Sequence, residues 1–100
     1  MRVLRTEAYA EWIDNLKDPT GRARVLMRVD RLTHGNPGDH RNLTEGVSEL
    51  KDDVGPGYGV YYSLCVDELL LLLAGGSKAS QPKDIARALQ LNPTFRDASH

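Results

Sequence analysis

The residues best suited to chemistry in this chain flank a Val-Gly-Pro-Gly segment at positions 54–57. This segment is a strong turn signal, and a tight turn here would pair the residues on its two sides as a β-hairpin. Lys51 would then lie across from Gly59 and close to Tyr61. A lysine that acts as a general base must lose its proton, which the carboxylates that follow Lys51 in the sequence oppose. The residues around Lys51 therefore argue against its acting as a general base.

A structural role competes with the chemical one for several residues. Lys51 by itself could be a solvated strand lysine paired with Glu49 or Asp53. His34 and His40 flank a second Gly/Pro-rich turn, and imidazole is the side chain that titrates nearest to neutral pH. A histidine in a turn is usually only a turn residue, so we assign neither histidine a catalytic role.

The composition is that of an ordinary globular domain. Hydrophobic residues make up 40% and charged residues 27% of the 100 residues. The longest apolar run, Leu69–Ala74, is far too short to span a membrane. We expect one domain over residues 1–100, with an ordered core at 2–91 and a tail at 92–100.

Cysteine usage and charge narrow the class further. Cys65 is the only cysteine, so we expect no internal disulfide and no structural zinc site. The first residues lack the apolar core of a secretion signal, and a reducing cytoplasm is the expected location. The net charge of −1 argues against a general binder of polyanions, so any phosphate contact must be local.

Apolar periodicity predicts a helical hairpin, then a sheet, then a last helix. Tyr9, Trp12, Ile13 and Leu16 have helical spacing, and Thr6 is the candidate N-cap before them. Beyond position 40 the period changes from 3.6 to 2. The predicted elements are a strand at 2–5, a helix begun near 6, a helix from 18–20 to 34–38, strands at 47–52, 58–66 and 69–73, and a helix from 80–84 to the Asn92-Pro93 pair.

This order, β-α-α-β-β-β-α, indicates an α+β fold with a mainly antiparallel twisted sheet of about four strands. We expect the N-terminal helical hairpin and the C-terminal helix to pack on one face of the sheet. The other face would then be concave and open to solvent. Strand parity places Tyr58 and Tyr62 in the core, and Gly59 and Tyr61 on the open face with Lys51.

Several short motifs, which extend over about residues 3–91, resemble those of one protein family. Each motif is weak alone, but their order and spacing agree with the RelE/ParE toxin superfamily, specifically its HigB-like, phage-derived addiction-module branch. The motifs are Trp12-Ile13 with Leu16, Arg22-Ala23-Arg24, the turn at 35–39, Gly-Val-Ser-Glu-Leu-Lys at 46–51, Gly-Pro-Gly-Tyr-x-Val-Tyr at 55–61, and Leu-Leu-x-Gly-Gly-x-Lys at 72–78 followed by Gln81 and Lys83-Asp84-Ile85.

The resemblance implies a RelE-like fold and the toxin of a type II toxin–antitoxin module. Such toxins are ribosome-dependent mRNA endonucleases that arrest translation. The implied partners are a helix-turn-helix antitoxin, mRNA on the ribosome, and operator DNA only through the antitoxin, with no membrane. The cleavage needs no metal or other cofactor: the ribose 2′-OH attacks the adjacent phosphorus and leaves a 2′,3′-cyclic phosphate and a 5′-hydroxyl.

The resemblance also implies a catalytic set of Lys51, Gly59, Tyr61 and Lys78. Lys51 and Lys78 stand where the family has basic residues that reach the phosphate. Gly59 stands where the family has an arginine, the expected main phosphate clamp, so it should leave a gap among the lysines with no visible structural gain. Losing one preorganised cation typically costs about 10²–10³ in rate. We expect an inactive copy, through natural loss of activity or through a detoxifying substitution.

Tyr58, Arg41 and Lys83 are the expected RNA contacts. A tyrosine offers an aromatic face and a hydroxyl for a base or a ribose, as Tyr61 also does. Two alternatives to the endonuclease remain open: a ParE-like toxin that inhibits a topoisomerase, and a non-catalytic module that binds the antitoxin and acts as a co-repressor. The motifs at 55–58 and 75–78 favour the endonuclease.

Overall fold

The computed structural model describes the backbone of residues 1–98 and the side chains of residues 1–92. Three α-helices and a five-stranded sheet form an α+β architecture, as the sequence predicts. No helix in this part of the chain is long and apolar enough to cross a membrane. The elements are β1 (Arg2–Arg5), α1 (Glu7–Asp14), α2 (Pro19–Thr33), β2 (His40–Asn42), β3 (Ser48–Asp52), β4 (Tyr58–Cys65), β5 (Leu69–Ser77) and α3 (Gln81–Ala98), with short 3₁₀ turns at Val66–Glu68 and Lys78–Ser80.

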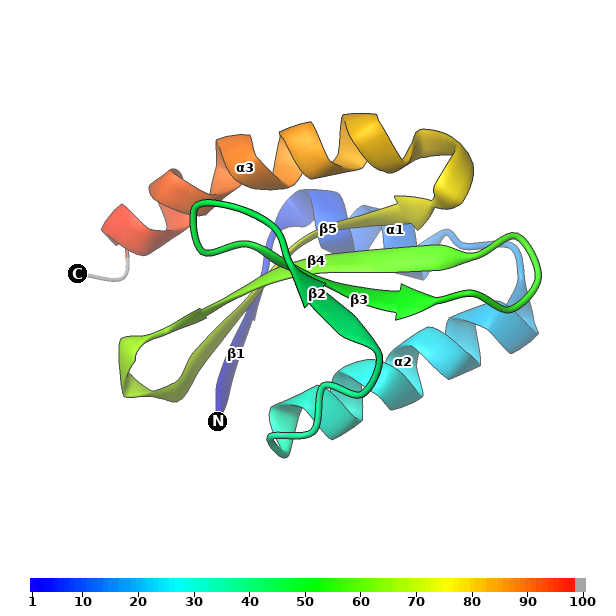
Figure 1. Ribbon diagram of the computed structural model, residues 1–100, viewed down its shortest axis with the longest axis horizontal. Coiled ribbons are helices and arrows are strands. Elements are labelled where there is room, and N and C mark those ends of the chain that lie inside the picture. Colours follow the sequence, from blue (N-terminus) through cyan, green and yellow to red (C-terminus); the bar gives the residue numbers. More distant parts are fainter. Residues whose placement is uncertain (99–100) are drawn as a thin grey trace.

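The sheet has the strand order β1-β5-β4-β3-β2 (Figure 1). β1 runs parallel to β5, and all other neighbours are antiparallel. The predicted hairpin of β3 and β4 is confirmed, with Lys51 paired to Gly59 and Glu49 paired to Tyr61. This register sets the residues expected to form the site on adjacent strands.

The strand β2 was not predicted. Its three residues are all exposed, and they show no alternation of apolar and polar side chains. They are extended because they pair with β3, from His40 opposite Leu50 to Asn42 opposite Ser48. A short polar edge strand of this kind depends on its neighbour rather than on its own sequence pattern.

Both N-terminal helices begin where the sequence predicts. The Thr6 hydroxyl caps α1 by accepting the Tyr9 N–H at 3.0 Å, and it also donates to the Leu73 carbonyl at 2.6 Å. Asp18 caps α2 by accepting the Gly21 N–H at 3.0 Å. Because Thr6 holds β5 as well as its own helix, this cap fixes where α1 leaves the sheet.

The helices cover both faces of the sheet, so the expectation of one open face is wrong. In Figure 1, α1 and α2 lie on one side of the sheet and α3 lies on the other. Tyr58 packs under α1 and α2, as parity predicts, whereas Tyr61 is only 1% exposed in the cluster that includes Ala88 of α3. The reason is the run Leu69–Leu73 in β5, whose side chains are all buried. A strand that is apolar on both faces needs a layer on each.

The helix α3 continues beyond the Asn92-Pro93 pair that was expected to end it, and it runs to Ala98. Proline removes one helical hydrogen bond, but its φ is compatible with a helix. Asn92 is buried, and its side-chain amide donates to the Glu45 carbonyl at 2.9 Å, which ties this turn to the loop before β3. The expected tail is therefore helical as far as Ala98, and its last two residues lie outside the described residues.

Candidate functional site

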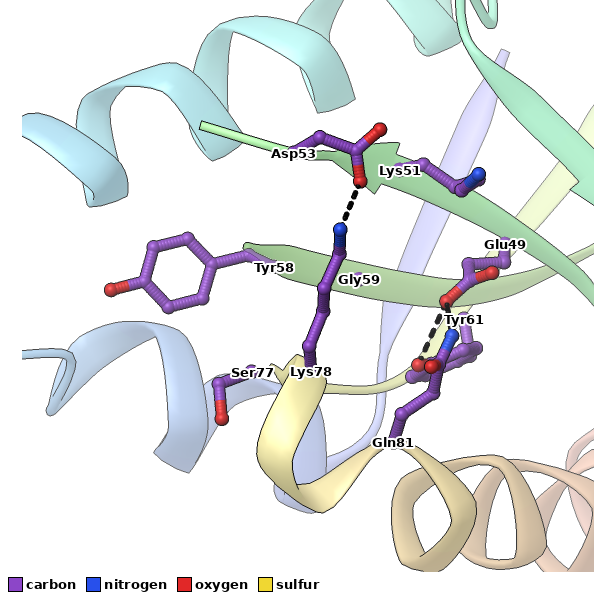
Figure 2. A pocket seen from close by; sticks show the side chains of 9 residues that line it. All are labelled: Glu49, Lys51, Asp53, Tyr58, Gly59, Tyr61, Ser77, Lys78 and Gln81. Atoms are coloured by element: carbon purple, nitrogen blue, oxygen red, sulfur yellow. Dashed lines mark hydrogen bonds and ion pairs between the residues drawn. The ribbon is translucent and has the colours of Figure 1, made fainter. Parts of the chain in front are cut away.

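The four residues predicted to be catalytic line one small pocket on the α3 side of the sheet (Figure 2). Lys51 lies on β3, Gly59 and Tyr61 lie on β4, and Lys78 lies in the turn after β5. The pocket has a volume of about 10 Å³, which is room for about one water molecule. The other lining residues are Glu49, Asp53, Tyr58, Ser77 and Gln81.

The buried carboxylate of Glu49 organises this pocket. Glu49 is 2% exposed and accepts hydrogen bonds from three side chains. The donors are Arg41 Nε at 2.6 Å, the Tyr61 hydroxyl at 2.9 Å and Gln81 Nε2 at 2.8 Å. A buried charge is tolerated only when it is paired and hydrogen-bonded, and here the guanidinium supplies the opposite charge. Glu49 thereby joins side chains from β2, β4 and α3.

Tyr61 is held as a neutral phenol. Its burial raises the pKa of the hydroxyl well above the usual value, and the hydrogen bond to Glu49 raises this pKa further. The phenolic proton is directed at Glu49. A substrate can therefore use this hydroxyl as a donor only if it displaces the carboxylate.

The space beside Gly59, where the family's arginine side chain was expected to be missing, is occupied by Tyr61 and Glu49, so the expectation of a gap there is wrong. A Cβ atom on Gly59 would lie 2.8 Å from the Tyr61 hydroxyl and 2.8 Å from Glu49 Oε2. Both distances are shorter than van der Waals contact. Glycine at this position thus has a packing role, because the absence of a side chain leaves room for the hydrogen-bonded Tyr61 hydroxyl and Glu49 carboxylate to lie against the main chain of β4.

Lys78 spans the mouth of the pocket. Its aliphatic carbons lie against Gly57, where an added Cβ would be 2.8 Å from Cδ. Its Nζ is 2.7 Å from Asp53 Oδ1, and this ammonium holds the pKa of the Asp53 carboxyl below its usual value of 3.8. The two side chains are 57% and 50% exposed, so an incoming phosphate can compete with Asp53 for the lysine.

Lys51 is the cation available to a ligand. Among the described side chains it takes part in no ion pair. Its main chain is fixed on both sides: the N–H donates to the Asp39 carbonyl at 3.0 Å, and the carbonyl accepts from Arg28 Nη1 at 2.7 Å. The ammonium of Lys51 is therefore presented from a well-held strand end.

The three predicted RNA contacts lie in different surroundings. Tyr58 lines the pocket, but its ring belongs to the core under α1 and α2, and its hydroxyl donates to Asp18 at 2.7 Å. Figure 2 shows this ring pointing away from Glu49 and both lysines. Arg41 is half-exposed and binds Glu49 at the pocket. Lys83 is exposed on α3 and does not line the pocket.

Sequence reasoning missed Glu49, Asp53 and Gln81 as members of the site. Glu49 could have been found from strand periodicity, because it lies two residues before Lys51 in the same strand and therefore faces the same side of the sheet. Asp53 was considered only as a partner of Lys51, whereas it pairs with Lys78. Nothing local in the sequence relates Gln81 to Glu49, because 32 positions separate them.

Fold and site together define a small α+β protein whose pocket, on a mainly antiparallel sheet, combines two lysines with two carboxylates, one of which is paired with Arg41 outside the lining. The chain is 36% identical over 88 residues to a protein of Haemophilus influenzae that is described as uncharacterized. The match covers 88% of this chain and 89% of that protein, so the chain belongs to the same family. No family model and no solved structure matches the sequence.

Proposed function

We propose that this protein is the toxin of a type II toxin–antitoxin module, with a RelE-like fold and a HigB-like site for mRNA. One observation carries the proposal: Lys51, Lys78 and Tyr61, which the family resemblance singles out from three separate segments, line the same pocket beside Gly59. The order of elements supports it too, with a helical hairpin preceding a mainly antiparallel sheet.

The proposed reaction is metal-independent cleavage of mRNA. A bond forms between the ribose O2′ and the adjacent phosphorus, and the bond from phosphorus to O5′ breaks. The O2′ proton goes to a base, and the departing O5′ takes up a proton to become a hydroxyl. In this scheme Lys51 and Lys78 stabilise the charge that develops on the phosphoryl oxygens.

The same site predicts weak activity. Glu49 places a fixed negative charge beside position 59, where the family has a cation, and Asp53 holds Lys78 away from a substrate. An RNA phosphate must therefore displace Lys78 from Asp53 and approach Glu49. We infer that this copy is slow or inactive as a nuclease.

The proposed partners follow from this function. They are a helix-turn-helix antitoxin, mRNA on the ribosome, and operator DNA reached through the antitoxin, all in the cytoplasm. A second candidate is a non-catalytic module that binds the antitoxin and acts as a co-repressor. The ion pair between Lys78 and Asp53 favours this second candidate, because it occupies one of the two lysines that the reaction needs.

Induced expression of matched variants in a growing culture tests the proposal. An arginine side chain at position 59 must displace the Tyr61 hydroxyl and Glu49 Oε2, so circular dichroism first checks that Gly59→Arg still folds. The folded variant should produce growth arrest and mRNA cleavage that the parent chain lacks or shows weakly. In that background Lys51→Ala should abolish the arrest, and Lys17→Ala, which removes the same charge at an exposed position outside the pocket, should not.

Equal and strong toxicity with Gly59 and with Gly59→Arg would refute the assignment of the site. Arrest accompanied by DNA damage signalling instead of mRNA cleavage would indicate a ParE-like topoisomerase inhibitor. No arrest by any variant, with antitoxin binding retained, would indicate the non-catalytic module.

A further inference from the structure

The edge of β5 is only partly covered by a neighbouring strand. β1 pairs with β5 from Arg2 opposite Leu69 to Arg5 opposite Leu72, and there β1 ends. The Thr6 N–H then donates to the Leu72 carbonyl and the Thr6 hydroxyl donates to the Leu73 carbonyl, before the chain enters α1. β5 itself continues to Ser77. Within the described residues, the edge of its last four residues on the β1 side has no strand beside it.

An open groove of about 610 Å³ lies along this uncovered edge. Its walls come from α1 and α3, and its floor is Ala74 and Gly75 of β5. The two helices pack on opposite faces of β5, α1 against Leu70 and Leu72 and α3 against Leu71 and Leu73. Residues 69–74 and Gly76 are buried, whereas Gly75 is partly exposed. Glycine has no side chain, so the exposed surface of Gly75 is main chain.

The groove has an excess of negative charge. Glu7 and Glu11 on one wall and Asp84 on the other face a single cation, Arg87. Within the described side chains none of these four residues forms an ion pair. Trp12 also lines the groove and adds an apolar surface to it. Its ring lies directly against Gly75.

We propose that this groove binds an extended, basic segment of another protein, which adds to the sheet as a strand alongside the last residues of β5. An exposed strand edge offers main-chain donors and acceptors to such a segment. Four added residues would extend for about 13 Å. Lysine or arginine side chains of the segment would meet the carboxylates of Glu7, Glu11 and Asp84. A helix in the same place would leave the main chain of Gly75 unpaired.

This binding site is separate from the proposed nuclease site. None of the residues that line the groove also lines the pocket around Glu49. The inference therefore stands or fails independently of RNA cleavage, and it is tested on the purified chain without RNA.

The probe is the synthetic peptide Ac-Lys-Val-Lys-Val-Lys-Val-NH₂, titrated into the full chain at low salt and followed by amide NMR shifts. Binding should shift the Gly75 amide signal most strongly and slow its hydrogen exchange. Two further peptides carry N-methyl groups on alternate residues, in opposite phases. Because an added strand pairs through one edge, one of these two peptides should lose binding and the other should keep it. The Glu-Val analogue should not bind.

Two variants with the same charge change, one in the groove and one outside it, distinguish binding in the groove from nonspecific attraction between the basic peptide and the protein. Glu11→Lys should weaken peptide binding about fivefold or more, whereas Asp30→Lys, an equal charge change at an exposed position on α2, should weaken it less than about twofold. The inference is overturned if the basic peptide fails to bind at about 1 mM. It is equally overturned if both methylated peptides bind like the parent peptide, or if the shifts map away from Gly75.

Discussion

The substitution Gly59→Ala measures how tightly the pocket is closed. A Cβ at this position would lie 2.8 Å from the Tyr61 hydroxyl and from Glu49 Oε2, so the hydrogen bond between them must break or lengthen. A hydrogen bond to a charged group contributes about 1.5–3 kcal/mol. Alanine in a strand recovers about 0.5–1 kcal/mol relative to glycine. We expect a net loss of about 1–2 kcal/mol in the free energy of unfolding.

Urea unfolding followed by circular dichroism measures this loss as a midpoint lowered by about 0.3–2 M, given slopes of about 1–3 kcal/mol/M. The control is a double-mutant cycle with Tyr61→Phe, which removes the hydroxyl in advance. In that background Gly59→Ala should cost clearly less, so the two changes should not add. Equal costs in both backgrounds, or a stabilising Gly59→Ala, would show that the Tyr61–Glu49 pair does not occupy the space at position 59.

Two further predictions concern the cap of α1 and the acid sensitivity of the pocket mouth. Thr6→Val keeps the side-chain shape but removes the bonds to Tyr9 and Leu73, so urea unfolding should show a loss of about 1–3 kcal/mol; an unchanged midpoint would contradict the dual role of the cap. Lys78 lowers the pKa of Asp53 in the folded state, so the ionised pair stabilises the protein above pH 3.8, and this contribution is lost as the pH falls through the folded-state pKa. Asp53→Asn should flatten the stability curve below about pH 3.8, and an unchanged curve would refute the pairing.

Local signals in the sequence were sufficient for most of the elements. Thr6 and Asp18 are capping residues directly before helical periodicity, and the structure uses both as caps. The Val-Gly-Pro-Gly turn determined the hairpin, and the pairing of Lys51 with Gly59 followed from it. These features involve residues close in the chain, where propensity and turn chemistry act most directly.

The errors concern contacts between distant segments. Five leucines in β5 indicated a strand buried on both faces, but not which helix covers each face, and α3 was placed on the wrong one. β2 carries no pattern of its own. The bond between Gln81 and Glu49 depends on how α3 docks, so the organising role of Glu49 emerged only from the assembled sheet.

The position of β5 has a consequence for biosynthesis. This strand lies between β1 and β4 in the sheet and contributes side chains to both hydrophobic clusters, yet β1 ends at Arg5 and β5 begins only at Leu69. A nascent chain that ends before Leu69 has an N-terminal strand with no neighbour to pair with. Contacts of such long sequence separation slow folding, so we expect the sheet to assemble only after Leu69–Ser77 has been synthesised.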